Sequence, residues 1–279
     1  MFDLIWRLVK RFAVLLPGLV IAYFSVRDVF PVFDKRVPDV LAVLLTYIVG
    51  AYVLIPALIR LFRIVRPPKH LPLYCVTPDG FASDPVNIGI IGSKQELTAI
   101  MEQAGWYVAD PHTIKHLPRH LLSIIFGWSY PNAPVSSLYL FGRKQDVAFE
   151  IPIEGAAGSR HHVRFWATTY KSKKRLDVKS IHWHHRRALL EKENLLWVGA
   201  ASLDVGIAPI RHNLQLTHMV HPDTNAEREL IISQLKAEGV VARVNKIRLG
   251  NAYKLTNRAW RASLHTDGKM SIITLAKKR

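Results

Sequence analysis

Hydrophobic residues form two apolar runs near the start of the chain and alternate with polar residues after them. The longer run, "VLAVLLTYIVGAYVLIPALI", places 20 residues without a charge at positions 40–59. At a rise of about 1.5 Å per residue, a helix of this length crosses a hydrocarbon core of about 30 Å. The pattern therefore predicts a transmembrane helix near residues 40–62.

The shorter run, residues 12–26, is broken by Pro17 and Gly18 and follows three basic residues. It fits a short membrane span, an interfacial helix or the apolar core of a signal peptide. The sequence "YFSVRDVF" after it offers no small-x-small cleavage site, so we favour a hairpin of two transmembrane helices with a turn at residues 27–39. Residues 1–65 are then the membrane anchor.

Basic residues near the span ends predict the orientation of this hairpin. Three lie before the first span, three lie in the turn, and four follow the second span: Arg60, Arg63, Arg66 and Lys69. Because basic residues are enriched in cytoplasmic loops, we expect both ends of the hairpin in the cytoplasm. The lone cysteine, Cys75, excludes an intramolecular disulfide and fits a reducing compartment.

A proline-rich segment separates the anchor from the rest of the chain. Residues 66–83 read "RPPKHLPLYCVTPDGFAS" and are expected to form an extended connector. The soluble domain is then expected at residues 84–279.

The domain begins with a strand–helix–strand pattern. Residues 86–92 predict a strand, and Ser93 with Glu96 predicts a capping box that starts a helix ended by Gly105. Residues 106–110 predict the next strand. The apolar face of the helix holds Leu97, Ile100, Met101 and Ala104.

The same order returns late in the chain. Residues 215–220 predict a strand, Thr224 with Glu227 predicts a second capping box, and Gly239 ends the helix before a strand at residues 240–247. The second helix is about one turn longer, so we do not treat the two strand–helix–strand segments as an internal repeat. Its apolar contacts are expected from Ile231, Ile232 and Leu235.

Between these units lie four segments whose hydrophobic residues alternate as in antiparallel strands. The sequence "GRKQ" at residues 142–145 predicts a hairpin between the first two. Helices that flank a mostly antiparallel sheet make the predicted class α+β. The four segments are residues 136–142, 146–153, 161–169 and 195–206.

A charge-dense insertion at residues 170–194 separates the last two of these strands. It lacks a Cys or carboxylate at ligand spacing, so a solvated basic loop is favoured over a metal site. Its basic cluster is His182, His184, His185, Arg186 and Arg187.

Charge indicates the class of partner. The net charge is +17, and residues 67–279 carry 29 Lys and Arg against 17 Asp and Glu, or +12. Beside a membrane anchor, this excess predicts attraction to an anionic leaflet or to phosphorylated ligands. Nucleic acid is a poorer explanation, because no zinc-finger, RRM or helix-turn-helix pattern is present.

The stretch "GSRHHVRFW" at residues 158–166 raises the question of a reactive site. Neighbouring side chains of a strand point to opposite faces, so His161 and His162 cannot face one ligand without a bulge. Periodicity allows a pair of His161 with His218. It equally allows a second group, His162 with Arg164 and Asp204.

Three interpretations of these polar residues stay open. The first is an acid–base or metal site, since imidazole and carboxylate share protons near neutral pH and bind zinc. Its catalytic candidates are His161, His162, His218 and Asp223. Its metal candidates are His161, His218, His221 and Glu227.

The second interpretation is an anion-binding patch, in which guanidinium groups hold phosphate or carboxylate. Its residues are Arg143, Arg164 and Arg228. The third is structural and leads the other two: His and Arg satisfy sheet edges, while Asp223 and Glu227 favour the positive end of the late helix. Under this interpretation Glu227 already has a capping role.

Other motifs narrow the reaction classes. The chain has no G-x-S-x-G elbow, P-loop or H-E-x-x-H motif, which leaves serine hydrolase, nucleotide hydrolase and zincin assignments unsupported. We expect four tryptophans to be core or interface aromatics: Trp106, Trp128, Trp166 and Trp197.

Four blocks resemble the LssY-like C-terminal domain family over about residues 84–249: "YPNAPVSSLYLFGRKQDVAFE", "RHHVRFW", "WVGAASLD" and "THMVHPDTNAERELI". That family consists of bacterial membrane-associated proteins, in which the domain stands alone behind transmembrane helices or is joined to DedA-type or phosphatidic-acid-phosphatase-type modules. It has been named as a secretion component, and no reaction is established for it. This sequence shows neither module, and its insertion is longer than the usual connection.

The resemblance and the anchor together imply an integral protein of the bacterial inner membrane with a cytoplasmic domain. We expect a non-catalytic role in binding or organising anionic envelope lipids or membrane partners, and we identify no cofactor. The alternative is a membrane-tethered hydrolase with a His/carboxylate site, with or without a metal, acting on a phosphorylated or lipid-linked substrate. Whether the protein is an enzyme stays open at this point.

Overall fold

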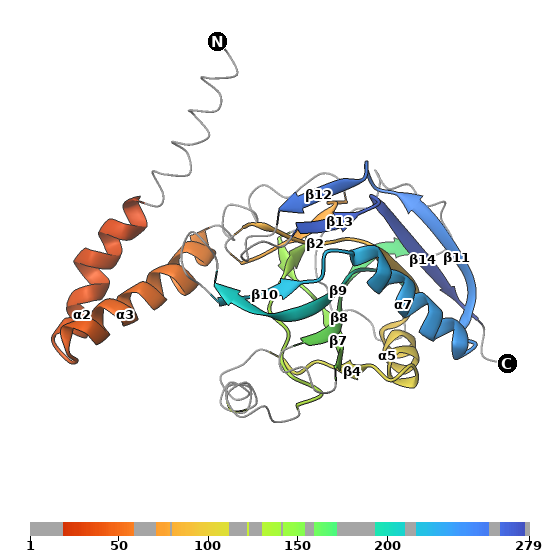
Figure 1. Ribbon diagram of the computed structural model, residues 1–279, viewed down its shortest axis with the longest axis horizontal. Helices are drawn as coiled ribbons and strands as arrows, with labels where there is room; N and C mark the ends of the chain where they lie inside the picture. Colours follow the sequence, from red (N-terminus) through yellow and green to blue (C-terminus); the bar gives the residue numbers. More distant parts are fainter. Residues whose placement is uncertain are drawn as a thin grey trace, which may run out of the picture. The chain divides into compact units, whose positions relative to one another are not determined.

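The computed structural model describes residues 19–58, 71–78, 80–111, 122, 130–140, 142–153, 159–171, 193–209, 216–256 and 263–276. The chain divides into two compact units (Figure 1). The first holds Met1–Val65 with Pro78–Gly80, and the second holds Arg66–Thr77 with Phe81–Arg279. Some predictions lie outside the described residues: parts of both predicted spans, the His-rich part of the insertion, and Trp128.

Two helical segments joined by a short turn make up the described part of the first unit. The first segment ends with the π-helical turn η1 (Ser25–Val29) and α2 (Phe30–Asp34). The second runs through α3 (Asp39–Val49) and η2 (Gly50–Leu54) to residue 58.

The predicted turn at residues 27–39 is wrong in its first half, because residues 27–34 are helical. Charged side chains do not end a helix by themselves. Pro38 keeps the chain from continuing as one helix, because a proline disfavours the helical conformation in the residue before it, Val37, and Pro38 is the N-cap of α3. The turn therefore occupies only residues 35–38.

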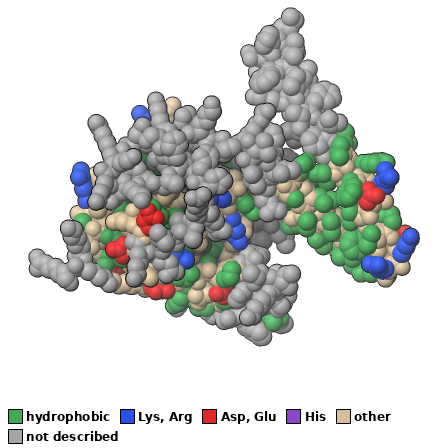
Figure 2. Space-filling view, turned by 180° about the vertical axis from the view of Figure 1, so that it is seen from behind, with side chains coloured by type: hydrophobic (Ala, Val, Ile, Leu, Met, Phe, Trp, Pro, Cys, Tyr) green, Lys and Arg blue, Asp and Glu red, His purple; other side chains and the backbone are tan. Residues whose placement is uncertain are grey.

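Small residues dominate the buried side of this unit. A Cβ on Gly50 would lie 3.2 Å from Ser25 Oγ, so glycine allows a close approach of the two helices. Large hydrophobic side chains are exposed, and Figure 2 shows them covering the helices while charged side chains gather at one end. By length and composition, the 20-residue helix Asp39–Leu58 is able to cross a membrane. The buried residues are Ser25, Ala42, Thr46, Gly50, Ala51 and Pro56.

A large sheet forms the centre of the second unit. Its strand order is β11-β14-β3-β9-β8-β7-β4, and β10 also pairs with β9. Among the described strands, β14 and β3 form the one parallel pair. The predicted α+β class with a mostly antiparallel sheet is therefore confirmed. The strands are β3 (Ile88–Gly92), β4 (Tyr107–Val108), β7 (Val147–Pro152), β8 (Ser159–Lys171), β9 (Leu195–Pro209), β10 (Leu216–Val220), β11 (Val241–Arg248) and β14 (Lys269–Leu275).

One face of the large sheet, the helix face, packs against α5 (Lys94–Gln103) and α7 (Thr224–Ala237), which lie on the same side in Figure 1. The predicted capping box of Ser93 with Glu96 is confirmed. Gly105 ends α5 with a φ of +84°, a conformation that favours glycine. The apolar contacts predicted for both helices are buried here, among them Leu97, Met101, Ile231 and Leu235.

The opposite face, the small-sheet face, packs against a four-stranded sheet of order β2-β1-β5-β6. Its strands are β1 (Tyr74–Val76), β2 (Ala82–Pro85), β5 (Tyr139–Leu140) and β6 (Arg143–Lys144). Residues assigned to the connector thus form β1 and the first half of β2, and Cys75 is fully buried. A further pair is β12 (Tyr253–Thr256) with β13 (Ser263–Thr266).

The predicted hairpin around "GRKQ" is wrong in its partner. Arg143 and Lys144 form β6, which pairs with β5, whereas β7 belongs to the large sheet between β8 and β4. The chain therefore changes sheets at this point. Three predicted core tryptophans are confirmed as buried: Trp106, Trp166 and Trp197.

Candidate acid–base and ligand-binding site

A cluster of polar side chains interrupts the small-sheet face where β7, β8 and β9 lie together. Alternation along β8 turns Arg160, His162 and Arg164 to this face. The register places Glu150 of β7 and Ser202 of β9 opposite His162. We call this group the Asp204 cluster, and it comprises Asp84, Glu150, Arg160, His162, Arg164, Ser202, Asp204 and His218.

The Asp204 cluster is buried although most of its members can carry charge. Glu150, His162 and Asp204 are 1% exposed and Arg160 is 7% exposed. His218 is the most exposed member, with 23% of its side chain accessible. Buried charges are costly unless they are paired, so the partners of each group decide what the cluster can do.

A β-bulge brings His218 into the cluster. Asp204 and Gly206 pair with consecutive residues of β10, so Val205 between them is unmatched. The extra residue shifts the alternation of β9, and His218 then lies on the same face as Asp204. Gly206 has a φ of +140°, which favours glycine, and a Cβ there would lie 3.2 Å from Met219 Cε.

Asp204 Oδ2 is the centre of three contacts. It lies 3.3 Å from His162 Nδ1 and 3.4 Å from His218 Nδ1. Arg160 Nε donates to the same oxygen at 3.4 Å, and Arg160 Nη1 donates to Glu150 Oε2 at 2.7 Å. Arg160 thus connects two carboxylates on the strands that flank its own.

Asp84 joins the cluster from the four-stranded sheet. Arg164 Nη1 donates to Asp84 Oδ2 at 2.8 Å, and His162 Nε2 lies 3.3 Å from the same oxygen. Ser202 Oγ lies 2.8 Å from His162 Nε2. Ser202, His162 and Asp204 are therefore connected in the order of a Ser-His-Asp triad.

Electrostatics argue against a nucleophilic role for Ser202. Burial lowers the pKa of His162, but the charge of Asp204, 3.3 Å from Nδ1, and the hydrogen bond to Asp84 outweigh burial and raise it. Burial alone would raise the pKa of Asp204, but the positive charges around it, first of all His162, have the larger effect and lower the pKa. A raised pKa favours the protonated imidazolium of His162, a form that cannot take a proton from Ser202 and that donates hydrogen bonds toward the two carboxylates.

Burial shifts the pKa values of two other members, and one of them is suited to proton transfer. Burial raises the pKa of Glu150 to about 7, against the opposing charge of Arg160. Burial lowers the pKa of His218 to about 4, so its imidazole is neutral at neutral pH. General acid–base groups work best with pKa values near the operating pH, a condition that Glu150 meets.

The hydrogen bonding of the Asp204 cluster is incomplete. Five of its buried polar atoms have no hydrogen-bond partner within the part of the chain that the structure describes. Buried polar groups are normally paired, so such a concentration indicates missing partners, whether water or ligand. The five atoms are Glu150 Oε1, Arg160 Nη2, His162 Nδ1, Asp204 Oδ1 and His218 Nδ1.

The helix face holds a separate His–carboxylate contact. His161 Nδ1 lies 3.0 Å from Glu227 Oε2 and 3.1 Å from Glu227 Oε1. Glu227 belongs to α7 and is 4% exposed. His161 and His218, one of the pairs allowed by periodicity, thus contact different carboxylates on opposite faces of the sheet.

The predicted capping box of Thr224 with Glu227 is wrong. Asp223 is the N-cap of α7 and accepts hydrogen bonds from the backbone N–H groups of Asn225 and Ala226. Thr224 Oγ1 instead donates to the backbone oxygen of His265. Glu227 has therefore no capping role, which removes the main argument for a purely structural interpretation.

The remaining acid–base and metal candidates lie on the surface. His221 and Asp223 are exposed, and the Asp223 N–H donates to His221 Nδ1 at 3.3 Å. No group of three or more His, Cys, Asp or Glu side chains among the described residues is placed to hold a metal ion. The catalytic and metal roles of these residues stay predictions.

Two of the three arginines predicted to bind anions are paired within the second unit. Arg143 Nη2 donates to Asp146 Oδ2 at 2.6 Å. Arg164 donates to Asp84, and its Nε donates to the backbone oxygen of Ser136 at 3.1 Å.

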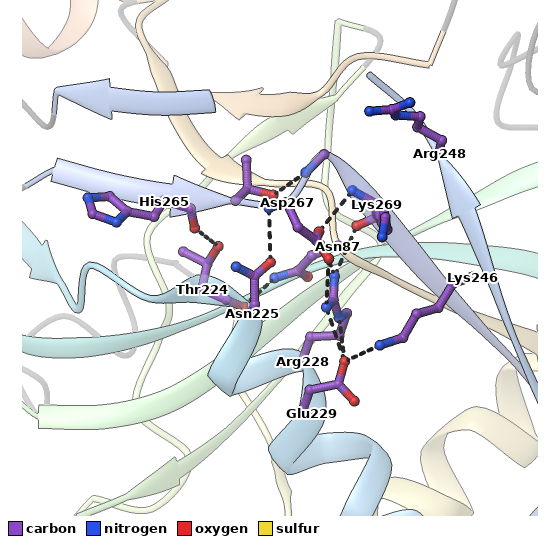
Figure 3. Close-up of polar contacts among 12 residues, drawn as sticks. Asn87, Thr224, Asn225, Arg228, Glu229, Lys246, Arg248, His265, Asp267 and Lys269 are labelled. Carbon is purple, nitrogen blue, oxygen red and sulfur yellow. Dashed lines mark hydrogen bonds and ion pairs between the residues drawn. The ribbon is translucent and has the colours of Figure 1, made fainter. Parts of the chain in front are cut away.

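The third arginine, Arg228, belongs to a network that Figure 3 shows. Its Nη1 donates to Asp267 Oδ1 and its Nη2 to Glu229 Oε1, both at 3.0 Å, and Lys246 Nζ donates to Glu229 Oε1 at 2.9 Å. The network fastens the start of α7 to β11 and to the turn before β14. The anion-binding role of the three arginines stays a prediction, which these pairings do not favour.

Several cluster members were absent from the predicted sites: Asp84, Glu150, Arg160 and Ser202. Glu150 and Arg160 had a detectable signal, because each is a charge in a segment that otherwise reads as a buried strand. Asp84 had none, because it follows a proline-rich segment and meets His162 only through tertiary packing.

The match to a known protein family covers the region that contains the Asp204 cluster. The family model described as "LssY C-terminus" matches residues 68–270. No curated protein and no solved structure matches the chain. The matched region contains β1, β2 and every member of the Asp204 cluster. The chain therefore belongs to the LssY C-terminus family.

Proposed function

We propose that the two N-terminal helical segments form a transmembrane hairpin in the bacterial inner membrane and hold the second unit on the cytoplasmic side. The apolar helix Asp39–Leu58 supports a span, and the close approach at Gly50 and Ser25 supports packing of two helices in lipid. The basic residues outside the two spans support the cytoplasmic side.

The proposed role of the second unit is to bind or organise anionic envelope lipids or membrane partners. One observation carries this proposal: a helix able to span a membrane precedes a region with a net charge of +12. Juxtamembrane basic groups contribute about 1 kcal/mol each near an anionic leaflet. Because the three predicted arginines are paired internally, surface lysines and arginines are expected to supply the attraction.

Two measurements test this proposal on the full-length protein. Alkaline extraction of bacterial membranes should leave it in the pellet, and release into the supernatant would contradict a transmembrane anchor. In nanodiscs, the protein should bind vesicles that contain anionic lipid at low salt and release them at high salt, because the Debye length shortens. Equal binding to zwitterionic vesicles would contradict the lipid role.

A second candidate is a membrane-tethered hydrolase that uses a His/carboxylate site. The contact of His218 with Asp204, with Glu150 linked through Arg160, favours it. Hydrolysis of a chromogenic phosphate ester by the full-length protein should then be lost in His218→Ala. The matched control is His221→Ala, which removes an exposed imidazole three residues away.

A further inference from the structure

The unpartnered atoms of the Asp204 cluster specify what its missing partner must offer. Arg160 Nη2 is a donor, whereas Asp204 Oδ1 and Glu150 Oε1 are acceptors when their carboxylates are ionised. All three residues are at least nine-tenths buried. A partner that completes these bonds must accept from a guanidinium and donate to carboxylate oxygens.

The three residues are connected, so one small group can meet them together. Arg160 donates to Asp204 with Nε and to Glu150 with Nη1, and its Nη2 has no partner among the described residues. Arg160 contacts Asp204 only through Nε and Oδ2, and the second nitrogen and second oxygen, Arg160 Nη2 and Asp204 Oδ1, have no hydrogen-bond partner among the described residues. A ligand that reaches these atoms completes both residues.

We infer that the Asp204 cluster is a binding site for a phosphate group that still carries a proton, as in inorganic phosphate or a phosphate monoester. The unprotonated oxygens of such a group accept from Arg160, and its P–OH donates to the carboxylate of Asp204. Sulfate has no proton to donate near neutral pH, so it would face the carboxylates without a hydrogen bond. A phosphodiester is excluded for the same reason.

Charge balance supports an anion in this cluster. The charges of Arg160 and Arg164 are balanced by Asp84 and Asp204, whose pKa values are lowered by the cations around them, and the charge of Asp204 outweighs burial and raises the pKa of His162, which favours a third positive charge. Glu150 balances the third charge only while it is ionised. Binding of a monoanion is therefore expected to be coupled to proton uptake by Glu150.

His218 is the expected point of entry. It contacts Asp204 and is the most exposed member of the cluster, whereas Arg160 is 7% exposed and Glu150 is 1% exposed. The site does not rest on the proposed attraction to anionic surfaces, which depends on exposed basic groups. Its ligand comes either from solution or from a lipid whose head group is a phosphate monoester.

The first test measures binding of inorganic phosphate and of sulfate to the full-length protein in zwitterionic nanodiscs by titration calorimetry. At about pH 6, phosphate should bind at least about tenfold more tightly than sulfate, the effect of one lost hydrogen bond to a charged group. Phosphate affinity should fall as the pH rises to about 8, because both phosphate and Glu150 lose protons. Equal affinity for the two anions, or no binding of either, would overturn the inference.

The second test changes the acceptor. Asp204→Asn places an amide N–H₂ where a carboxylate oxygen was, so phosphate affinity should fall at least about tenfold and the preference over sulfate should disappear. Asp223→Asn is the matched control, because Asn is an equally good N-cap and the residue is exposed. If Asp204→Asn does not fold, Arg160→Lys replaces it, because it keeps the charge but removes the Nη2 donor, and an unchanged phosphate affinity in the folded variant refutes the site.

Competition against bound inorganic phosphate distinguishes the two sources of the ligand. Soluble glycerol phosphate that competes with inorganic phosphate indicates a solution ligand, whereas competition only by monoester lipid in the nanodisc indicates a head group. Competition by neither, with inorganic phosphate still bound, supports inorganic phosphate itself as the ligand. Salt-sensitive vesicle binding that persists in Asp204→Asn leaves the proposed lipid role intact, so failure of one idea is distinguishable from failure of the other.

Discussion

The Asp204 cluster and the Arg228 network both contain a buried arginine between two carboxylates, yet they differ in how completely they are paired. Arg228 donates to Asp267 and Glu229, and no buried side-chain atom of these three lacks a partner among the described residues. The Asp204 cluster leaves five such atoms unpartnered.

Solvent exposure explains why the two groups differ in how completely their hydrogen bonds are paired. The side chains of Glu229 and Asp267 are 47% and 33% exposed, so water can complete their hydrogen bonds. Glu150 and Asp204 are 1% exposed and depend on what is enclosed with them. A buried charge alone therefore does not indicate a functional site, whereas incomplete pairing in a dry environment does.

The largest effect is expected for Arg160→Ala. The substitution leaves Glu150 and Asp204 buried without the cation that connects them, and removing one partner of a buried ion pair costs about 3–5 kcal/mol. Urea unfolding followed by tryptophan fluorescence measures the free energy of unfolding. The exposed Arg248→Ala is the control and should change it by less than about 0.5 kcal/mol; equal losses in both variants would contradict the comparison.

Next in size is the pH dependence contributed by Glu150. Its pKa is raised from 4.5 to about 7, so between these values the folded protein keeps a proton that the unfolded chain has lost. Stability contributed by this group is present below about pH 4.5 and is lost as the pH rises to about 7, by up to about 3 kcal/mol. Wild type should lose stability relative to Glu150→Gln across this window.

His218 acts in the opposite direction and must be separated from Glu150. Its pKa is lowered to about 4 from 6.5, so it contributes stability that rises between these values. The difference between wild type and Glu150→Gln cancels this contribution. A difference that stays constant from pH 4.5 to 7 would show that Glu150 does not hold a proton in the fold.

A smaller loss is expected for Arg228→Ala. Its two carboxylates can turn toward water, so the cost is about 1–2 kcal/mol from lost hydrogen bonds between α7 and the strands. The same urea titration measures it. A loss as large as that of Arg160→Ala would remove the distinction between the two clusters.

The smallest effect is expected for Lys246→Ala at the edge of the Arg228 network. Both Lys246 and Glu229 are about half exposed, and exposed ion pairs contribute about 0–1 kcal/mol. The change should shrink further in high salt. A salt-independent loss above about 1 kcal/mol would mean that the network is more enclosed than its exposure indicates.

Local patterns in the sequence determined much of the fold. The capping box at Ser93, the glycine after α5, the apolar faces of both helices and the alternation along the strands depend on residues within a few positions of one another. The same is true of the apolar run that forms the helix Asp39–Leu58. Such patterns are readable because neighbours in sequence are neighbours in space.

Where two local patterns competed, the prediction from the sequence chose the wrong one. Thr224 with Glu227 matched a capping box, but Asp223 lies one position earlier and caps the helix instead. Likewise "GRKQ" matched a hairpin, while the tertiary structure used Arg143 and Lys144 as a strand of another sheet. Each choice depended on which alternative packed against the rest of the domain.

The membership of the Asp204 cluster was decided by tertiary structure alone. Strand register set Glu150 and Ser202 opposite His162, a bulge at Val205 turned His218 toward Asp204, and the four-stranded sheet supplied Asp84. Pairing between distant strands is fixed by the packing of whole faces, and a shift of one residue would have turned each side chain away. The sequence by itself therefore determined many of the elements and the family, and only the three-dimensional packing determined the remaining strands and which charges meet.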